Sequence, residues 1–275
     1  MSRASSATSS DALGRLVEDA GINASAPREQ LWIDGWLVRY GPGKARRARC
    51  IQAVAAGTLP IDDKLERCLK VFSAAGLVPH VRITPWSLPA GLDDRLAALG
   101  WAAIDETRVM VASVAAPTAA APSLPPGHEV EACDGASYAA WIGAARGSTA
   151  VERDGHARRL TQSPVPYCAF RVRDAGGEFV AGGQIACEGR VAGLYDVLTV
   201  EAARGRGIAS ALCAHLVDRA AEAGATTVYL QVDAGNTAAI AVYRRLGFAD
   251  SYRYHYRTSP RRSDAPVAPT PASGI

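Results

Sequence analysis

A short loop with two arginines and two glycines is the part of this sequence best suited to chemistry. Residues 204–210 read RGRGIAS; they follow a run typical of a strand and precede a helical pattern of apolar residues. Glycines remove Cβ atoms where a ligand could approach, and the first turn of a helix has backbone N–H groups without helical partners. With the helix dipole and the charges of Arg204 and Arg206, this loop is suited to binding a diphosphate.

Two interpretations of the loop compete. Gly205 and Gly207 begin a partial match to the dinucleotide fingerprint G-x-G-x-x-G, and Asp233 ends the next predicted strand, where a ribose-binding acid would stand. However, Ser210 replaces the third glycine, and four residues separate the strand from the first glycine. The strands upstream are also predicted to form antiparallel hairpins. A nicotinamide-dependent enzyme is therefore the less well supported interpretation.

The second interpretation rests on a longer pattern. Residues 204–209 fit Q/R-x-x-G-x-G/A, and the chain continues with Asn236, Ala239, Tyr243 and the run Leu246-Gly247-Phe248. From His128 to Arg257, about half of the chain, the sequence resembles the GCN5-related N-acetyltransferase (GNAT) family. The resemblance implies an enzyme that uses acetyl-CoA as co-substrate and acetylates a primary amine of a small molecule, amino acid or peptide by direct transfer. A non-catalytic module of the same fold that binds or senses acyl-CoA is the alternative.

The resemblance also implies where the co-substrate lies. In the family, the strand before the loop diverges from the next strand, and the pantetheine arm lies in the gap. The backbone of residues 198–200 would then hold the arm and the thioester carbonyl, and the loop would hold the pyrophosphate. Asn236 either bonds the cofactor or caps its helix. The expected cofactor-binding residues are Leu198, Thr199, Val200, Arg204, Gly205, Arg206, Gly207, Ile208, Ala209, Ser210 and Asn236.

Acetyl transfer needs an uncharged amine, a polarised carbonyl and a proton for the leaving thiolate. The resemblance implies Tyr243 as the general acid, although the spacing of Ile240, Tyr243 and Leu246 also suits packing on one helix face. Asp196, beside the thioester, and Glu201, at the end of the same strand, are the candidates for the base, acting through water. Solvated surface charge is the alternative role for both carboxylates.

The acceptor site is less defined by the sequence. Arg146, Glu152 and Tyr195 fall in the region that shapes the acceptor pocket in relatives, and the resemblance implies that they contact the substrate. The histidines are scattered and the six cysteines form no C-x-x-C pair, so we expect no metal site and reduced thiols.

We expect an α/β (α+β) fold of two tandem GNAT-like domains, each a mixed, mostly antiparallel sheet flanked by helices. Gly76 and Gly224 stand 148 residues apart, Gly100 and Gly247 stand 147 apart, and similar elements surround both pairs, which indicates an internal repeat. The first copy has one glycine, a proline and Asp62 where the second has the arginine loop, and it has no counterpart of Tyr243. We therefore expect the first copy to be degenerate and catalytically silent.

The domain boundaries follow from composition. We expect a flexible tail and a short helix over 1–26, the degenerate domain over 27–115, a Pro/Ala linker over 116–126, the catalytic domain over 127–258 and a disordered tail over 259–275. The helix near the start is predicted to begin at Ser10, and a hairpin is predicted to turn at Gly41-Pro42-Gly43.

The bulk composition excludes several classes of protein. The chain has 275 residues, 48% hydrophobic and 21% charged, with a net charge of +3, which is too small to indicate nucleic-acid binding. No apolar run is long enough to span a bilayer. The serine-rich start is compatible with a transit peptide, but a solvated tail is the favoured interpretation. We therefore expect a cytoplasmic protein with no nucleic-acid or membrane partner, as a monomer or a homodimer.

Overall fold

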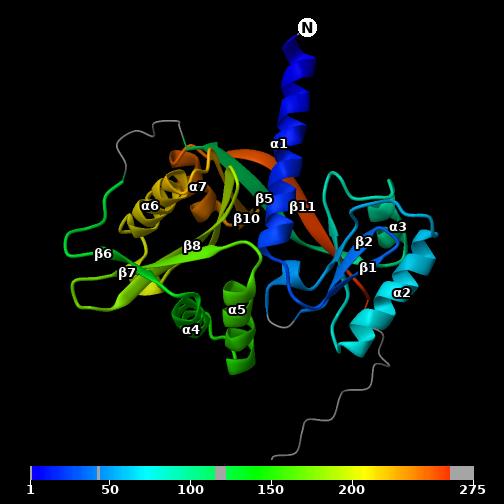
Figure 1. The fold of residues 1–275 in the computed structure, drawn as a ribbon, viewed down its shortest axis with the longest axis horizontal. Coiled ribbons are helices and arrows are strands. Elements are labelled where there is room, and N and C mark those ends of the chain that lie inside the picture. Colours follow the sequence, from blue (N-terminus) through cyan, green and yellow to red (C-terminus); the bar gives the residue numbers. More distant parts are fainter. Residues whose placement is uncertain (1, 42–43, 115–121, 261–275) are drawn as a thin grey trace, which may run out of the picture.

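A single sheet of eleven strands runs through the whole molecule, with helices on both faces (Figure 1). The computed structural model describes residues 2–41, 44–114 and 122–260, without the side chains of residues 2–9. No helix among these residues has both the length and the apolar character needed to cross a membrane.

The first half contains α1 (Ser2–Ala24), β1 (Gln30–Ile33), β2 (Trp36–Arg39), β3 (Ile51–Gln52), α2 (Ile61–Ala74), β4 (His80–Ile83), α3 (Leu92–Ala98) and β5 (Ala102–Ser113). The second half contains β6 (Glu129–Cys133), α4 (Gly135–Ala145), α5 (Ala150–Gln162), β7 (Tyr167–Arg173), β8 (Phe179–Glu188), β9 (Val191–Thr199), α6 (Ile208–Glu222), β10 (Thr227–Asp233), α7 (Thr237–Arg245) and β11 (Ala249–Thr258). Short 3₁₀ helices cover Arg46–Ala48 and Glu201–Ala203.

The two halves exchange their last strands. The strand order is β1-β2-β3-β4-β11-β5-β10-β9-β8-β7-β6, so β11 lies between two strands of the first half and β5 joins β11 to β10. Each half therefore completes the sheet of the other. The sheet is mixed and mostly antiparallel, as the sequence predicted, and only β3 with β4 and β9 with β10 are parallel neighbours among the described strands.

The exchange follows the symmetry of the repeat. The order α2–β4–α3–β5 in the first half corresponds to α6–β10–α7–β11 in the second. The strands β5 and β11 pair antiparallel, and Thr107 lies opposite Tyr254, which is 147 residues later in the chain. That separation is the repeat offset predicted from the glycines, so a pseudo-two-fold axis passes near this pair.

Alternation along β9 and β10 sorts the side chains of the second half to two faces. Leu194 and Leu230 point into an apolar core that packs against α6 and α7. The neighbouring residues Tyr195 and Tyr229 point to the other face and pack with Val17 of α1. On that same face α4 and α5 pack together beside the sheet (Figure 1). The helix α1 thus crosses from the first half onto the sheet of the second.

One local prediction was wrong, and one hairpin was not predicted. The helix α1 begins at Ser2, eight residues before the predicted start at Ser10, in the segment that we expected to be a flexible tail. The first hairpin turns at Asp34-Gly35, where the φ angles of 42° and 84° are those of a two-residue hairpin turn. Of the predicted turn, Gly41 follows β2, and residues 42–43 lie outside the described residues. Most of the predicted linker, residues 116–121, also lies outside them.

Candidate functional site

The loop between β9 and α6 has the geometry of an anion-binding turn. Gly205 and Gly207 adopt φ angles of 77° and 79°, left-handed values that favour glycine. Gly207 is the N-cap residue of α6, and no side chain in the described chain caps this helix. No described atom lies within 4 Å of a Cβ built on either glycine. The first N–H groups of α6 therefore face open space without a partner from the helix or from a cap.

Two arginines add positive charge to the same turn. Arg204 and Arg206 are both exposed. Nε of Arg204 donates a hydrogen bond to the backbone oxygen of Thr199 at 3.3 Å, which fixes this guanidinium beside the end of β9. The helix dipole contributes roughly half a positive charge at the same place. These donors are of the kind that binds a diphosphate, so the assignment of residues 204–210 stays a prediction with suitable geometry.

The strands β9 and β10 separate where a co-substrate arm would need to enter. Their parallel pairing ends at Leu194 opposite Leu230, and residues 195–199 of β9 do not pair with β10. A bulge at Asp196, where φ is 51°, shifts the register of β9 against β8 and directs the strand away. The exposed backbone edge that results can accept an extended chain as an additional strand. Leu198 and Thr199, which are predicted to hold the pantetheine arm, belong to this unpaired edge of β9, and Val200 directly follows the strand.

One side chain on that edge has an unsatisfied hydroxyl. Oγ1 of Thr199 is buried and has no hydrogen-bond partner among the described residues. Buried hydroxyls are normally bonded, so this atom is available to a polar group of a bound arm. The residues at the gap therefore fit the co-substrate that the sequence pattern implies.

Tyr243 lies on α7 and packs against the apolar core under the loop, and Asn236 is the residue that precedes this helix. Tyr243 is half-buried, packs edge-on against Phe248 with ring centroids 6.0 Å apart, and has no hydrogen-bond partner for its hydroxyl among the described residues. Burial, with a smaller effect of Cys213, raises the pKa of Tyr243 above its usual value, so the hydroxyl keeps its proton at neutral pH. Oδ1 of Asn236 accepts a hydrogen bond from the backbone N–H of Ala239 at 3.1 Å, which makes Asn236 the cap of α7.

A cavity of about 260 Å³ lies on the face of the sheet that carries α4 and α5. Tyr195, Asp196, Arg146 and Glu152 all line it, so the structure brings the three predicted substrate-binding residues together with one candidate for the base. Glu201 is elsewhere: it is exposed in the 3₁₀ turn after β9.

The carboxylate of Asp196 is the electrostatic centre of this cavity. Nη1 of Arg146 lies 2.7 Å from Oδ1, Nε2 of His156 lies 3.1 Å from Oδ2, and Nη2 of Arg159 lies 3.9 Å from Oδ2. Burial alone would raise the pKa of Asp196, but the close approach of His156 and the charges of the two arginines hold it well below its usual range. A carboxylate with so low a pKa is always ionised and is a weak base.

Four residues of the cavity were missed from the sequence. His156 and Arg159 follow Glu152 at intervals of four and seven residues on α5, a spacing that places them on one helix face and could have been recognised. Lys44 and Arg47 come from the first half, and no local pattern indicates that they reach this site.

The corresponding loop of the first half is occupied by its own chain. The carboxylate of Asp34 accepts hydrogen bonds from the backbone N–H groups of Thr58 and Leu59, at 2.9 Å and 2.8 Å to Oδ2. A Cβ on Gly57 would lie 2.1 Å from the backbone oxygen of Asp34, so the loop has no free space there. Asp62, the acid that the sequence places at this helix start, pairs with Arg95, and it is Asp34 that accepts hydrogen bonds from the amide groups.

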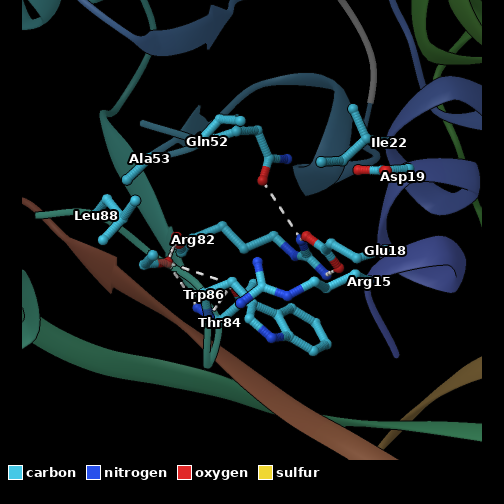
Figure 2. A pocket seen from close by; sticks show the side chains of 12 residues that line it. Arg15, Glu18, Asp19, Ile22, Gln52, Ala53, Arg82, Thr84, Trp86 and Leu88 are labelled. Atoms are coloured by element: carbon cyan, nitrogen blue, oxygen red, sulfur yellow. Dashed lines mark hydrogen bonds and ion pairs between the residues drawn. The ribbon is translucent and has the colours of Figure 1, made fainter. Parts of the chain in front are cut away.

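The parallel pair β3 and β4 of the first half has surroundings that differ from those of β9 and β10 in the second half. Gln52 pairs with Arg82 at the end of the ladder, in the position that Leu194 and Leu230 hold in the second half. Figure 2 shows the cavity of about 170 Å³ at this place, where Glu18 of α1 meets Arg82. Glu18 also accepts a hydrogen bond from the hydroxyl of Tyr252 at 2.5 Å. A buried ion pair thus holds α1 beside the end of this parallel pair.

Comparison with known proteins agrees with this geometry. A family model described as "Probable histone acetyltransferase Rv0428c C-terminal" matches residues 12–257. The chain belongs to this family. It is a GNAT protein, as the loop pattern predicted, and the family model extends over the first half as well as the second.

Named relatives and solved structures resemble this GNAT protein over different lengths. It is 26% identical over 231 residues to the "Uncharacterized N-acetyltransferase YobR" of Bacillus subtilis, covering 82% of this chain and 90% of the relative. It is 40% identical over 70 residues to the "[Ribosomal protein bS18]-alanine N-acetyltransferase" of Escherichia coli, where the match spans 25% of this chain and 47% of that relative, about half its length.

Two solved structures show the same fold. A GCN5-related N-acetyltransferase from Kribbella flavida has a TM-score of 0.63 at 18% identity, covering 86% of this chain and 91% of that one. A tandem GNAT protein from the clavulanic acid biosynthesis pathway has a TM-score of 0.54 at 14% identity, covering 78% and 76%. These two likenesses show the fold alone, whereas the family model and the named relatives support acetyl transfer in general.

Proposed function

We propose that this protein is an acetyl-CoA-dependent N-acetyltransferase that moves an acetyl group directly onto a primary amine of a small molecule, an amino acid or a peptide. The observation that carries the proposal is the separation of β9 from β10 after Leu194, beside the uncapped start of α6. Both features are needed to hold an acyl-CoA, because one accepts the extended arm and the other accepts the diphosphate.

Each part of the co-substrate has a place in the proposal. The N–H groups of residues 205–210 and the guanidinium groups of Arg204 and Arg206 bind the diphosphate. The backbone of residues 198–200 pairs with the pantetheine arm and positions the thioester carbonyl. Asn236 caps α7 and leaves its side-chain NH₂ free to donate to the co-substrate.

The acetyl transfer needs only a few functional groups of the protein. The amine nitrogen attacks the thioester carbonyl carbon, the carbon–sulfur bond breaks, and the thiolate takes a proton from Tyr243, whose hydroxyl is protonated at neutral pH. The amine loses its proton to water. Asp196 is held ionised by its arginines and is too weakly basic to drive this step, so Glu201 is the better candidate for a base that acts through water.

Thermal stabilisation separates the proposal from its alternatives. CoA should raise the melting temperature and NAD should not, because a ligand bound only by the folded state stabilises it by about 2.7 kcal/mol at one hundred times its Kd. Thiol release from acetyl-CoA should then depend on an added amine, and the panel should include peptides with a free N-terminal alanine. A melting temperature that rises with NAD but not with CoA would refute the proposal. Stabilisation by CoA without thiol release on any amine would favour the non-catalytic module.

A further inference from the structure

Arg47 is a cation of the first half that lies in the acceptor cavity of the second. It belongs to the 3₁₀ turn Arg46–Ala48, and it lines the cavity together with Tyr195 and Asp196. Its Nη1 donates a hydrogen bond to Oε1 of Gln231, which also accepts one from the hydroxyl of Tyr254 at 2.7 Å. Its guanidinium carbon lies 5.6 Å from the centroid of the Tyr195 ring. These neutral contacts fix the guanidinium in place.

No carboxylate neutralises Arg47. Among the described residues it has no acidic partner within ion-pair distance, although it is half-buried. The carboxylate of Glu18 is taken by Arg82, whose Nη2 lies 2.9 Å from Oε2, and by Tyr252. At a site with an effective dielectric constant of about 20, an unpaired cation attracts an anion several times more strongly than it would in water.

The cavity as a whole carries an excess of positive charge. Four permanent cations line it: Lys44, Arg47, Arg146 and Arg159. Its two carboxylates are already engaged, because Asp196 pairs with Arg146 and Glu152 both caps α5 and lies 3.4 Å from Lys44. Leaving His156 out of the count, the lining has a net charge of +2. Such a cavity repels a polyamine and attracts an acceptor with an anionic group.

Arg47 also lies at the point where the two strands separate. It contacts Tyr195 and Gln231, the first residues of β9 and β10 after the last paired residues. An anion bound by Arg47 would therefore place the rest of the acceptor beside the gap. The volume of about 260 Å³ is slightly below the range of about 300–1,000 Å³ for drug-sized ligands, which favours a small acceptor.

We propose that the acceptor is a small amine that carries a carboxylate, as an amino acid does, and that Arg47 binds this carboxylate while the amine points to the gap. The inference rests on the proposed function, since it names the substrate class of the same site. Arg47 is in this view a residue that determines acceptor specificity, contributed by the half of the chain that lacks a free phosphate loop.

The first test uses the wild-type protein with matched pairs of acceptors. The rate of thiol release from saturating acetyl-CoA is measured for the common L-amino acids, for their carboxamides and for spermidine. A charge-assisted hydrogen bond to a carboxylate corresponds to a preference of about 10- to 100-fold in kcat/KM for the acid over its amide. Converting the acid to the amide lowers the pKa of the amine and so favours the amide, which means that amine basicity cannot produce the expected result.

The second test uses variants. Arg47→Met keeps the length of the side chain and removes the charge, and it should reduce the preference for the acid to within about threefold. Arg47→Lys keeps a point charge without the planar fork, and it should retain part of the preference. The control is Arg67→Met, the same change at an exposed position of α2, which should leave the preference intact. The melting temperature and the CoA affinity of each variant show whether it is folded.

Product binding separates failure of this inference from failure of the proposed function. N-acetyl-amino acids and their amides are compared as stabilising ligands at equal concentration, in the presence of CoA. If no amine gives thiol release, stabilisation that is selective for the acid and lost in Arg47→Met still supports the carboxylate site while the acetyltransferase proposal fails. Equal use or equal binding of acid and amide, a preference for spermidine, or an unchanged preference in a folded Arg47→Met protein would each overturn the inference. If neither Arg47 variant folds, the wild-type comparison decides.

Discussion

Replacing Arg206 by methionine removes one cation from the loop before α6 while most of the side-chain length is kept. Arg206 is exposed and has no ion pair among the described residues, so the change should shift the free energy of unfolding by no more than about 0.5 kcal/mol. A diphosphate about 5 Å away would lose roughly 0.8 kcal/mol per charge in water, and any direct hydrogen bond in addition. We therefore expect the Kd for CoA to rise about tenfold, which corresponds to about 1.4 kcal/mol.

The assay is the equilibrium affinity for two ligands at two ionic strengths. CoA carries the diphosphate and pantetheine does not, so Arg206→Met should weaken only CoA. Because exposed charges are screened beyond a Debye length of about 10 Å at 0.1 M salt, the difference between wild type and variant should shrink as the salt concentration rises.

Arg67→Met again supplies the control, because it removes one exposed arginine from α2 in the other half. It should leave both affinities unchanged, which shows that net charge alone is not responsible. The reasoning is wrong if Arg206→Met binds CoA as tightly as the wild type at low salt, or if CoA and pantetheine lose affinity equally.

Three further predictions concern the acid, the cavity and the exchanged strands. Tyr243→Phe should lower kcat about a hundredfold with less than a twofold change in CoA affinity, and unchanged turnover in steady-state kinetics would exclude Tyr243 as the acid. Asp196→Asn should cost stability, measured by urea unfolding, by a constant amount above about pH 5; this cost should shrink as the pH falls below about 4, because the lowered pKa of Asp196 stabilises the folded state only where its unfolded form is ionised. A fragment of residues 122–260 should lack native circular dichroism alone and regain it with residues 1–114, because β10 and β11 need β5; a folded lone fragment would contradict this.

The sequence predicted the loop and its flanking elements well because their signals are local. The run typical of a strand before the loop is β9 (Val191–Thr199), and the helical pattern after the loop is α6, whose N-cap is Gly207. Glycines at left-handed φ angles and a change from a period of two to one of 3.6 mark this boundary within a few residues.

The sequence was less informative where a turn lies inside short strands or where the deciding contact is distant. Asp34-Gly35 lies within a run that is typical of one extended segment, because the two strands it joins are only four residues long. The obstruction of the first phosphate loop by Asp34 depends on a hydrogen bond across 24 residues to Thr58, which no spacing rule indicates. The exchange of β5 and β11 is likewise a property of the whole sheet.

The exchange gives the first half a physical role that its own loop does not explain. With Asp34 bonded to them, the amide groups of Thr58 and Leu59 in the first half are not free for a diphosphate, whereas we propose that the loop of the second half binds one. Yet the turn Arg46–Ala48 lies against β9 and β10 because β5 and β11 lock the two halves into one sheet. In the two proposals, each half therefore supplies one part of the site. The arginine loop of the second half binds CoA, and Arg47 of the first half binds the carboxylate of the acceptor. Substitutions near Arg47 should change acceptor preference while the affinity for CoA stays constant, and substitutions in the loop should do the reverse.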